Sequence, residues 1–185
     1  MERNEADTFI AILRGINVSG KTMIKMPTLV KIFESLGFEN VKTYVQSGNV
    51  IFQSQLKDMN DLKNQIQVKI ENDFGTNIPA IILDGKYITE VQENNPFVKE
   101  SDTDLSKLHV TFLSEEPESV NVAKIDADKY FPDEFIIDKK VIYLYCPGGY
   151  GKTKLHNNFF ENRLKVNATT RNWNTVNALV KLVAE

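Results

Sequence analysis

Residues 43–52, TYVQSGNVIF, decide the fold of this chain. Two runs suited to β-strands, residues 41–46 and 50–52, flank the tripeptide Ser47-Gly48-Asn49. Glycine and asparagine tolerate the positive φ that a tight hairpin turn needs. The stretch therefore predicts two neighbouring antiparallel strands.

The elements around this hairpin follow in a regular order. Residues 9–13, FIAIL, form an apolar run typical of a buried strand. Helices are predicted from Pro27 to Gly37 and from Asp58 to Gly75, since proline suits a helix start, aspartate caps it and glycine ends it. A strand at residues 78–83 completes the order β-α-β-β-α-β, which is the split βαβ arrangement of ferredoxin-like domains.

The second part of the chain repeats this order less cleanly. Strands are predicted at residues 108–113, 135–137 and 141–145, with a residual strand at residues 169–170. Helices are predicted at residues 86–94, 117–124 and 151–164, and a final helix begins after Asn172. We therefore expect an α+β fold of two ferredoxin-like (βαββα-type) halves with antiparallel sheets, tightly packed. The predicted domains are residues 1–85 and residues 86–185, the second with the extra C-terminal helix.

Composition narrows the classes of function. A single cysteine, Cys146, excludes an internal disulfide framework, and with only two histidines a metal cluster is not expected. No apolar run approaches the roughly 20 residues of a membrane span. The polar, acidic N-terminus does not resemble a secretory signal. From these features we expect a cytoplasmic protein without a metal site and without a membrane partner.

Charge is unevenly distributed along the chain. The net charge of −3 combines +1 for residues 1–52, −10 for residues 53–138 and +6 for residues 139–185. No acidic residue occurs between Asp7 and Glu34. Two segments far apart in sequence are thus locally basic. They are either ordinary solvated surface or parts of one anion-binding surface.

The basic segment near the N-terminus contains a Gly-rich loop. Gly15 to Thr22, GINVSGKT, satisfies the phosphate-loop pattern and follows a strand. In a phosphate loop the helix begins at the Gly-Lys-Thr itself, whereas Pro27 would lie inside such a helix and cost about 3 kcal/mol. The predicted hairpin also disagrees with the parallel sheet of the NTPases. A P-loop NTPase is therefore the less favoured interpretation.

A second Gly-rich basic turn, residues 147–154, and the start of the last helix, residues 169–174, have similar chemistry. Backbone N–H groups of such turns and of helix N-termini bind anions, and arginine suits a bidentate anion. Turn formation, helix capping and solvated charge are the alternative explanations for the same residues. The candidate ligand-binding residues are Arg14, Asn17, Lys21, Lys25, Gln46, Ser47, Asn49, Lys152, Arg171 and Asn172.

Three blocks of sequence together resemble a known family. They are residues 13–26 (LRGINVSGKTMIKM), residues 43–52 and residues 169–175 (TTRNWNT). The chain resembles the uncharacterised bacterial family named domain of unknown function 1697. The resemblance implies a cytoplasmic protein with an α+β fold on ferredoxin-like topology, and it implies no activity, substrate or catalytic residue.

Two classes of function follow from the sequence. The first is a protein that binds a small anionic ligand, phosphorylated or nucleotide-like, in a polar concavity where the basic loops converge. The alternative is a nucleic-acid-binding protein, because ferredoxin-like sheets can display aromatic side chains such as Tyr44 and Phe52 that stack on bases. The overall acidity favours the first class. No general acid, general base or cofactor can be assigned, so enzymatic activity stays open.

Overall fold

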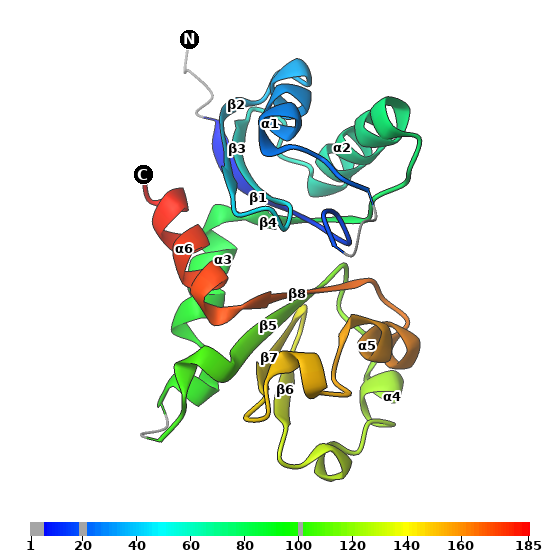
Figure 1. Ribbon diagram of the computed structural model, residues 1–185, viewed down its shortest axis with the longest axis vertical. Helices are drawn as coiled ribbons and strands as arrows, with labels where there is room; N and C mark the ends of the chain where they lie inside the picture. Colours follow the sequence, from blue (N-terminus) through cyan, green and yellow to red (C-terminus); the bar gives the residue numbers. More distant parts are fainter. Residues whose placement is uncertain (1–5, 19–21, 100–101) are drawn as a thin grey trace. The chain divides into compact units, whose positions relative to one another are not determined.

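Two antiparallel sheets of four strands each form the framework of the chain (Figure 1). The computed structural model describes residues 6–18, 22–99 and 102–185. The chain divides into two compact units, Met1–Thr89 with Ala178–Glu185 and Glu90–Asn177, which we call the first and the second unit. The strand orders are β2-β3-β1-β4 and β6-β7-β5-β8. Both sheets therefore have the same topology, and the predicted pair of ferredoxin-like α+β halves is confirmed.

The first unit contains the predicted order of elements. Its strands and helices are β1 (Asp7–Leu13), α1 (Met26–Ser35), β2 (Glu39–Tyr44), β3 (Asn49–Ser54), α2 (Met59–Phe74) and β4 (Ala80–Asp84). The start of α3 (Gly85–Glu93) and the end of α6 (Trp173–Val183) also belong to it. Strand β1 pairs antiparallel with β3 on one side and with β4 on the other. The strand that leads into the Gly-rich loop is therefore central in its sheet.

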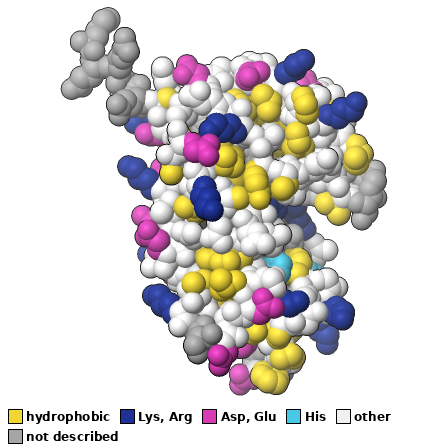
Figure 2. Space-filling view, turned by 60° about the vertical axis from the view of Figure 1, so that its left-hand side comes forward, with side chains coloured by type: hydrophobic (Ala, Val, Ile, Leu, Met, Phe, Trp, Pro, Cys, Tyr) yellow, Lys and Arg dark blue, Asp and Glu magenta, His cyan; other side chains and the backbone are white. Residues whose placement is uncertain are grey.

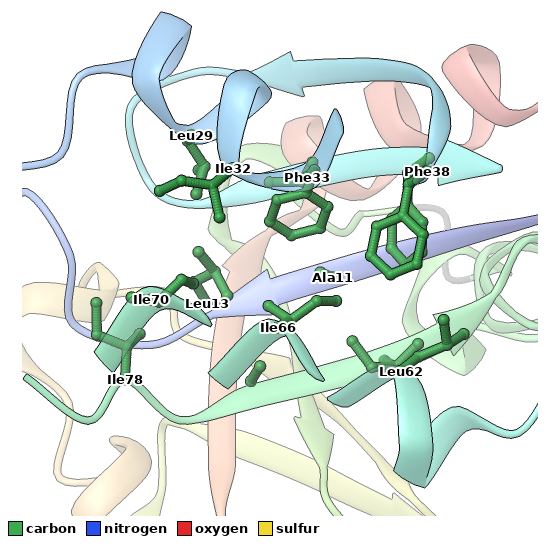
Figure 3. Close-up of a cluster of buried hydrophobic side chains, with 14 of the residues drawn as sticks. Ala11, Leu13, Leu29, Ile32, Phe33, Phe38, Leu62, Ile66, Ile70 and Ile78 are labelled. Carbon is green, nitrogen blue, oxygen red and sulfur yellow. The ribbon is translucent and has the colours of Figure 1, made fainter. Parts of the chain in front are cut away.

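The core of the first unit lies between this sheet and helices α1 and α2 (Figure 3). Side chains alternate across a strand, so Phe9, Ala11 and Leu13 of β1 face the two helices. The side chains of Ile10 and Ile12 point to the opposite face and are also fully buried. Burial on both faces explains why residues 9–13 are continuously apolar.

Local sequence signals set the helix ends as predicted. Pro27 lies in the first turn of α1. The Asp58 side chain accepts hydrogen bonds from the backbone N–H groups of Asn60 and Asp61, both at 2.9 Å. Gly75 ends α2 in the left-handed region, with φ +68°. The end of a helix leaves backbone N–H and C=O groups unpaired. Asp58 accepts bonds from two such N–H groups, and Pro27 has no N–H group that could be left unpaired.

The second unit repeats the arrangement with shorter helices. Its elements are β5 (Leu108–Leu113), α4 (Ser119–Val122), β6 (Glu134–Asp138), β7 (Val141–Tyr145), α5 (Asn157–Leu164) and β8 (Ala168–Asn172), with the end of α3 and the start of α6. Its hydrophobic core contains Leu113, Ile142, Leu144, Phe160 and Leu164. Trp173, at the start of α6, is buried.

Two predicted boundaries in the second unit are wrong. The helix predicted at residues 151–164 begins only at Asn157, and a 3₁₀ turn occupies Tyr150–Lys152. The Thr153 hydroxyl accepts a hydrogen bond from the N–H of Leu155, and His156 Nδ1 accepts one from the N–H of Phe159. Thr153 thus holds a turn ahead of the helix, and His156 caps the helix at its start. The residual strand predicted at residues 169–170 is longer, because β8 pairs with β5 along its whole length.

The predicted domains, residues 1–85 and residues 86–185 with the extra C-terminal helix, stay a prediction. In the structure, the first unit includes residues up to Thr89 and the last eight residues, Ala178–Glu185. Gly85 and Val183, at the two ends of this unit's sequence, lie close together: a Cβ built on Gly85 would meet Val183 Cγ1 at 2.7 Å. The C-terminal residues are thus part of the packing of the first unit.

A hairpin turn that contains Gly48, at φ +76°, is formed as predicted. It occupies residues 45–48 rather than 47–49, since β2 ends at Tyr44 and β3 begins at Asn49. The Gly48 carbonyl accepts a hydrogen bond from the N–H of Leu13 at 2.8 Å. A Cβ built on Gly48 would lie 2.8 Å from Leu13 Cβ and 2.9 Å from Ile16 Cδ1. Only glycine therefore fits between the turn and the end of β1.

Replacing Gly48 with alanine should lower the free energy of unfolding by about 2–4 kcal/mol, because the new Cβ adds both backbone strain and overpacking. Urea denaturation measures this change. Gly148→Ala is the matched control, since Gly148 has ordinary φ and no atom within 4 Å of the added Cβ. Equal stability of the two variants would contradict the close approach at Gly48.

Candidate functional site

In the first unit, the side chain of Asn17 connects the Gly-rich loop with the hairpin turn. Asn17 Nδ2 donates to the carbonyl oxygens of Ile24 and Gln46, both at 2.9 Å. Asn17 Oδ1 accepts from the N–H of Ile24 at 2.8 Å. One carboxamide thus closes residues 14–25 into a loop and fixes that loop to the turn. The structure therefore brings together two of the segments that were predicted to form the site.

The hairpin turn is held in a similar way by Asn49. This asparagine is fully buried, and its Nδ2 donates to the carbonyl oxygen of Tyr44 at 3.0 Å and to Ser47 Oγ at 2.9 Å. Asn17, Ser47 and Asn49 all take part in fixing the backbone. Turn chemistry, the alternative explanation for these residues, accounts for the contacts described.

The backbone of the loop has an unusual shape. Gly15, Asn17 and Thr22 have positive φ, at 75°, 56° and 36°. The N–H of Arg14 donates to the carbonyl of Pro79, and the N–H of Asn17 donates to the carbonyl of Thr22. Left-handed residues in a loop can orient successive N–H groups towards one point, which is how backbone nests bind anions. Lys21 lies outside the described residues, so its predicted role stays a prediction.

Helix α1 begins directly after this loop. Lys25 is its N-cap residue and is exposed, and no side chain caps the helix. The first turn also contains no acidic residue. The N-terminus of α1 therefore keeps the positive end of its helix dipole without a neighbouring carboxylate in that turn.

The rim of the loop and turn is partly apolar. Val18, Met23 and Val45 are 56%, 66% and 51% exposed. Gln46, the remaining polar residue at the tip, is exposed as well. A ligand at this tip would meet Lys25, Gln46 and backbone groups beside apolar side chains.

The architecture of a phosphate-loop NTPase is absent from the described residues. Helix α1 starts at Met26, after the whole of the matching pattern, and the strand before the pattern pairs antiparallel on both sides. The match to the phosphate-loop sequence pattern is therefore not accompanied by the strand and helix arrangement of a phosphate loop.

In the second unit, the predicted segments 147–154 and 169–174 contribute to one neighbourhood. The ring of Tyr150 stacks on His109, with centroids 4.7 Å apart, and His109 is paired with Asn172 across β5 and β8. Arg171 is only 9% exposed, and its Nη1 donates to the carbonyl of Thr170 at 3.0 Å. Burial lowers the pKa of Arg171 to about 10, an effect that the nearby Tyr150 opposes. The guanidinium is still charged at neutral pH.

The other predicted residues of this unit have distinct positions. Asn172 Oδ1 accepts from the N–H of Thr175 at 2.8 Å and caps α6, as predicted. Lys152 is exposed on the 3₁₀ turn. Arg14 and Arg171 belong to different units. The prediction that they reach a common ligand therefore stays a prediction.

The described residues offer no evident catalytic group. Cys146 is fully buried, and this burial raises the pKa of its thiol to about 11. Burial lowers the pKa of His109, whose Nδ1 lies 3.1 Å from the Lys107 carbonyl oxygen, so its neutral form is favoured. Among all the described residues, there is no group of three or more His, Cys, Asp or Glu side chains that could hold a metal ion. None of the described helices has the length and hydrophobicity of a membrane span.

Asn17→Ala should lower the free energy of unfolding by about 2–3 kcal/mol, because three hydrogen bonds are lost and alanine is strained at positive φ. Chemical denaturation of the full chain measures the change. Asn174→Ala is the matched control: Asn174 is exposed on α6, and its replacement should alter stability by less than about 0.5 kcal/mol. A stability loss no larger for Asn17→Ala than for the control would show that the carboxamide does not hold the loop.

Comparison with known proteins supports the fold of this chain and identifies its family. A solved structure described as that of a conserved bacterial protein from Streptococcus pneumoniae is similar to this chain, with a TM-score of 0.76 and 21% sequence identity. The similarity covers 97% of this chain and 99% of that one. At this identity it supports the two-unit fold and nothing further. Among curated proteins, none matches the chain.

The sequence pattern of one protein family matches residues 6–143, which is most of the chain. The matched range includes the Gly-rich loop and the hairpin turn that Asn17 connects. The resemblance to this family is thereby confirmed, and the matched range contains two of the three sequence blocks, residues 13–26 and 43–52. The chain belongs to the family described as "Protein of unknown function (DUF1697)".

Proposed function

We propose that this chain binds a small anionic ligand, such as a phosphorylated metabolite or a nucleotide, at the junction of loop 14–25 and helix α1. The observation that carries the proposal is the start of α1. This helix has no side-chain cap and no acidic residue in its first turn, and its N-cap residue is the exposed Lys25. A helix N-terminus attracts anions through its dipole. At α1 the dipole and Lys25 carry this attraction, because Pro27 has no N–H and the N–H groups of Thr28 and Leu29 donate to the Lys25 carbonyl.

The loop before the helix supports this proposal. Asn17 fixes the carbonyl and amide groups of Ile24 and the carbonyl group of Gln46, so these groups are in place before a ligand arrives. Preorganisation of this kind lowers the entropic cost of binding. The positive φ of Gly15 and Thr22 bends the backbone in the manner of anion-binding turns.

The charge of the segment supports an anion rather than a cation. Arg14, Lys21 and Lys25 are the charged residues between Asp7 and Lys31. We propose that Lys25, Lys21 and Arg14 attract the ligand and that Gln46 orients it, while Asn17, Ser47 and Asn49 hold the surrounding backbone. For Lys152, Arg171 and Asn172, which belong to the second unit, ligand binding stays a prediction.

Nucleic acid is the less supported alternative. Phe52, one of the two aromatic residues considered for base stacking, is fully buried among Phe9, Phe33 and Phe38. Figure 2 shows Lys and Arg side chains interspersed with Asp and Glu on the face in view, rather than a continuous basic surface. A continuous basic surface is the usual electrostatic feature of nucleic-acid binding. The small-ligand proposal is therefore preferred.

Lys25→Ala should weaken binding of the anionic probes pyrophosphate and ATP by about tenfold, because it removes a charge-assisted contact at the helix N-terminus. Isothermal titration calorimetry of the full chain, at two salt concentrations, measures this affinity. Lys31→Ala is the matched control, since Lys31 is exposed on the same helix but away from its N-terminus. Its affinity should equal that of the wild-type chain.

Two results would overturn the proposal. The first is the absence of saturable heat with either probe. The second is equal weakening by Lys25→Ala and Lys31→Ala, which would indicate a general charge effect. Tight binding of an oligonucleotide that falls steeply with salt would support the nucleic-acid alternative instead.

A further inference from the structure

A second candidate site lies at the opposite end of β1 from loop 14–25. It is a cavity of about 340 Å³ in the first unit, next to Ala6, the residue that precedes β1. The seven residues of β1 separate the two places, a distance of roughly 20 Å. The lining residues come from the end of α1, the start of β2, the end of β3 and one position of α2: Ala6, Leu36, Gly37, Phe38, Glu39, Gln53, Ser54, Gln55, Leu56 and Gln65.

One part of the lining is apolar and rigid. Phe38 is only 6% exposed, and its ring lies 4.6 Å from the ring of Phe52 in the core. Leu36 and Leu56 are half-buried and pack against the same core. These three side chains give the cavity an apolar base, which is the common feature of small-molecule sites.

The other part of the lining is rich in side-chain amides. Gln53 Oε1 accepts a hydrogen bond from Asn40 Nδ2 at 2.6 Å, so the Gln53 amide is oriented and its Nε2 can donate to a ligand. Gln55 and Gln65 are exposed and each carries one acceptor and one donor group. Amides from strand β3, from the segment that follows it and from helix α2 therefore lie beside the apolar base.

Ser54 adds a buried polar group to the lining. It is 6% exposed, and its Oγ accepts a hydrogen bond from the N–H of Leu56 at 3.0 Å. The hydroxyl proton can still be donated. The lining thus combines several donors with amide acceptors in a small volume.

The charge of the lining determines which class of ligand fits. None of the lining residues is Lys, Arg or His, and Glu39 is the only ionisable one among them. An anionic group would therefore find no cationic partner among these residues. The cavity is at the small end of the usual range for ligand sites, roughly 300–1,000 Å³. The cavity therefore suits a small uncharged molecule with hydrogen-bonding edges better than an anionic one.

We propose that this cavity binds an uncharged nucleobase or nucleoside, whose ring packs on Phe38, Leu36 and Leu56 and whose edge pairs with the glutamine amides. Amide side chains recognise base edges because each offers a donor and an acceptor side by side. The inference is independent of the anion-binding proposal, since no lining residue belongs to loop 14–25 or to the hairpin turn.

The experiment is an NMR titration of the ¹⁵N-labelled full chain with adenine, uracil and adenosine. Saturable shifts are expected for the backbone amides of residues 36–39 and 53–56. Gln65→Ala and Gln55→Ala should each weaken binding about five- to tenfold, through loss of one or two hydrogen bonds. Both residues are exposed, so neither replacement disturbs the core. Asn64→Ala, one position before Gln65 on the same helix, is the control and should leave the affinity unchanged.

Adenosine monophosphate distinguishes this site from the anion site. At the cavity it should bind no more tightly than adenosine, because no basic side chain among the lining residues meets its phosphate. The proposal is overturned if adenine, uracil and adenosine all fail to shift residues 36–39 and 53–56. It is also overturned if Gln65→Ala and Gln55→Ala bind as tightly as Asn64→Ala, or if the phosphate strengthens binding at these residues.

Discussion

The hydrogen bonds of the Asn17 carboxamide are the interaction on which the candidate anion site of the first unit depends. They join the two ends of the Gly-rich loop and attach it to the hairpin turn. The turn can approach because Gly48 has no side chain: a Cβ there would meet Leu13 and Ile16. The hydrogen bonds of Asn17 and the close contact between Gly48 and the end of β1 therefore fix the position of the loop that connects β1 with α1.

This arrangement separates residues that shape the site from residues that can meet a ligand. Asn17 and Asn49 use their amides on neighbouring backbone groups, as Asn172 does at the start of α6. Among the described residues of the loop and turn, Lys25 and Gln46 are exposed polar residues. Polar side chains in Gly-rich turns more often satisfy the backbone than bind a ligand. The proposed anion contact consequently depends on the helix N-terminus and its lysine.

Much of the fold could be predicted because its signals are local. The cap at Asp58, the stop at Gly75 and the turn at Gly48 each depend on a few neighbouring residues. The start of α5 was predicted wrongly, because Thr153 and His156 satisfy backbone groups that the helical pattern assigned to a helix. The burial of Arg171 and the cavity beside Gln53 and Gln65 depend on separate elements that meet only in the fold, so spacing in the sequence contains no sign of them. Residue types alone suggested anion-binding loops, but they could not show which amides the backbone would use.

Amide hydrogen exchange of the ligand-free chain tests most directly whether the loop is held in place before any ligand binds. The informative group is the N–H of Ile24, which donates to Asn17 Oδ1 and lies outside every strand and helix. The account predicts that this amide exchanges slowly, within an order of magnitude of the amides in the central strand β1, because opening it requires breaking the Asn17 network. Exchange of the Ile24 amide at the rate of an unstructured peptide, while β1 stays protected, would contradict the account.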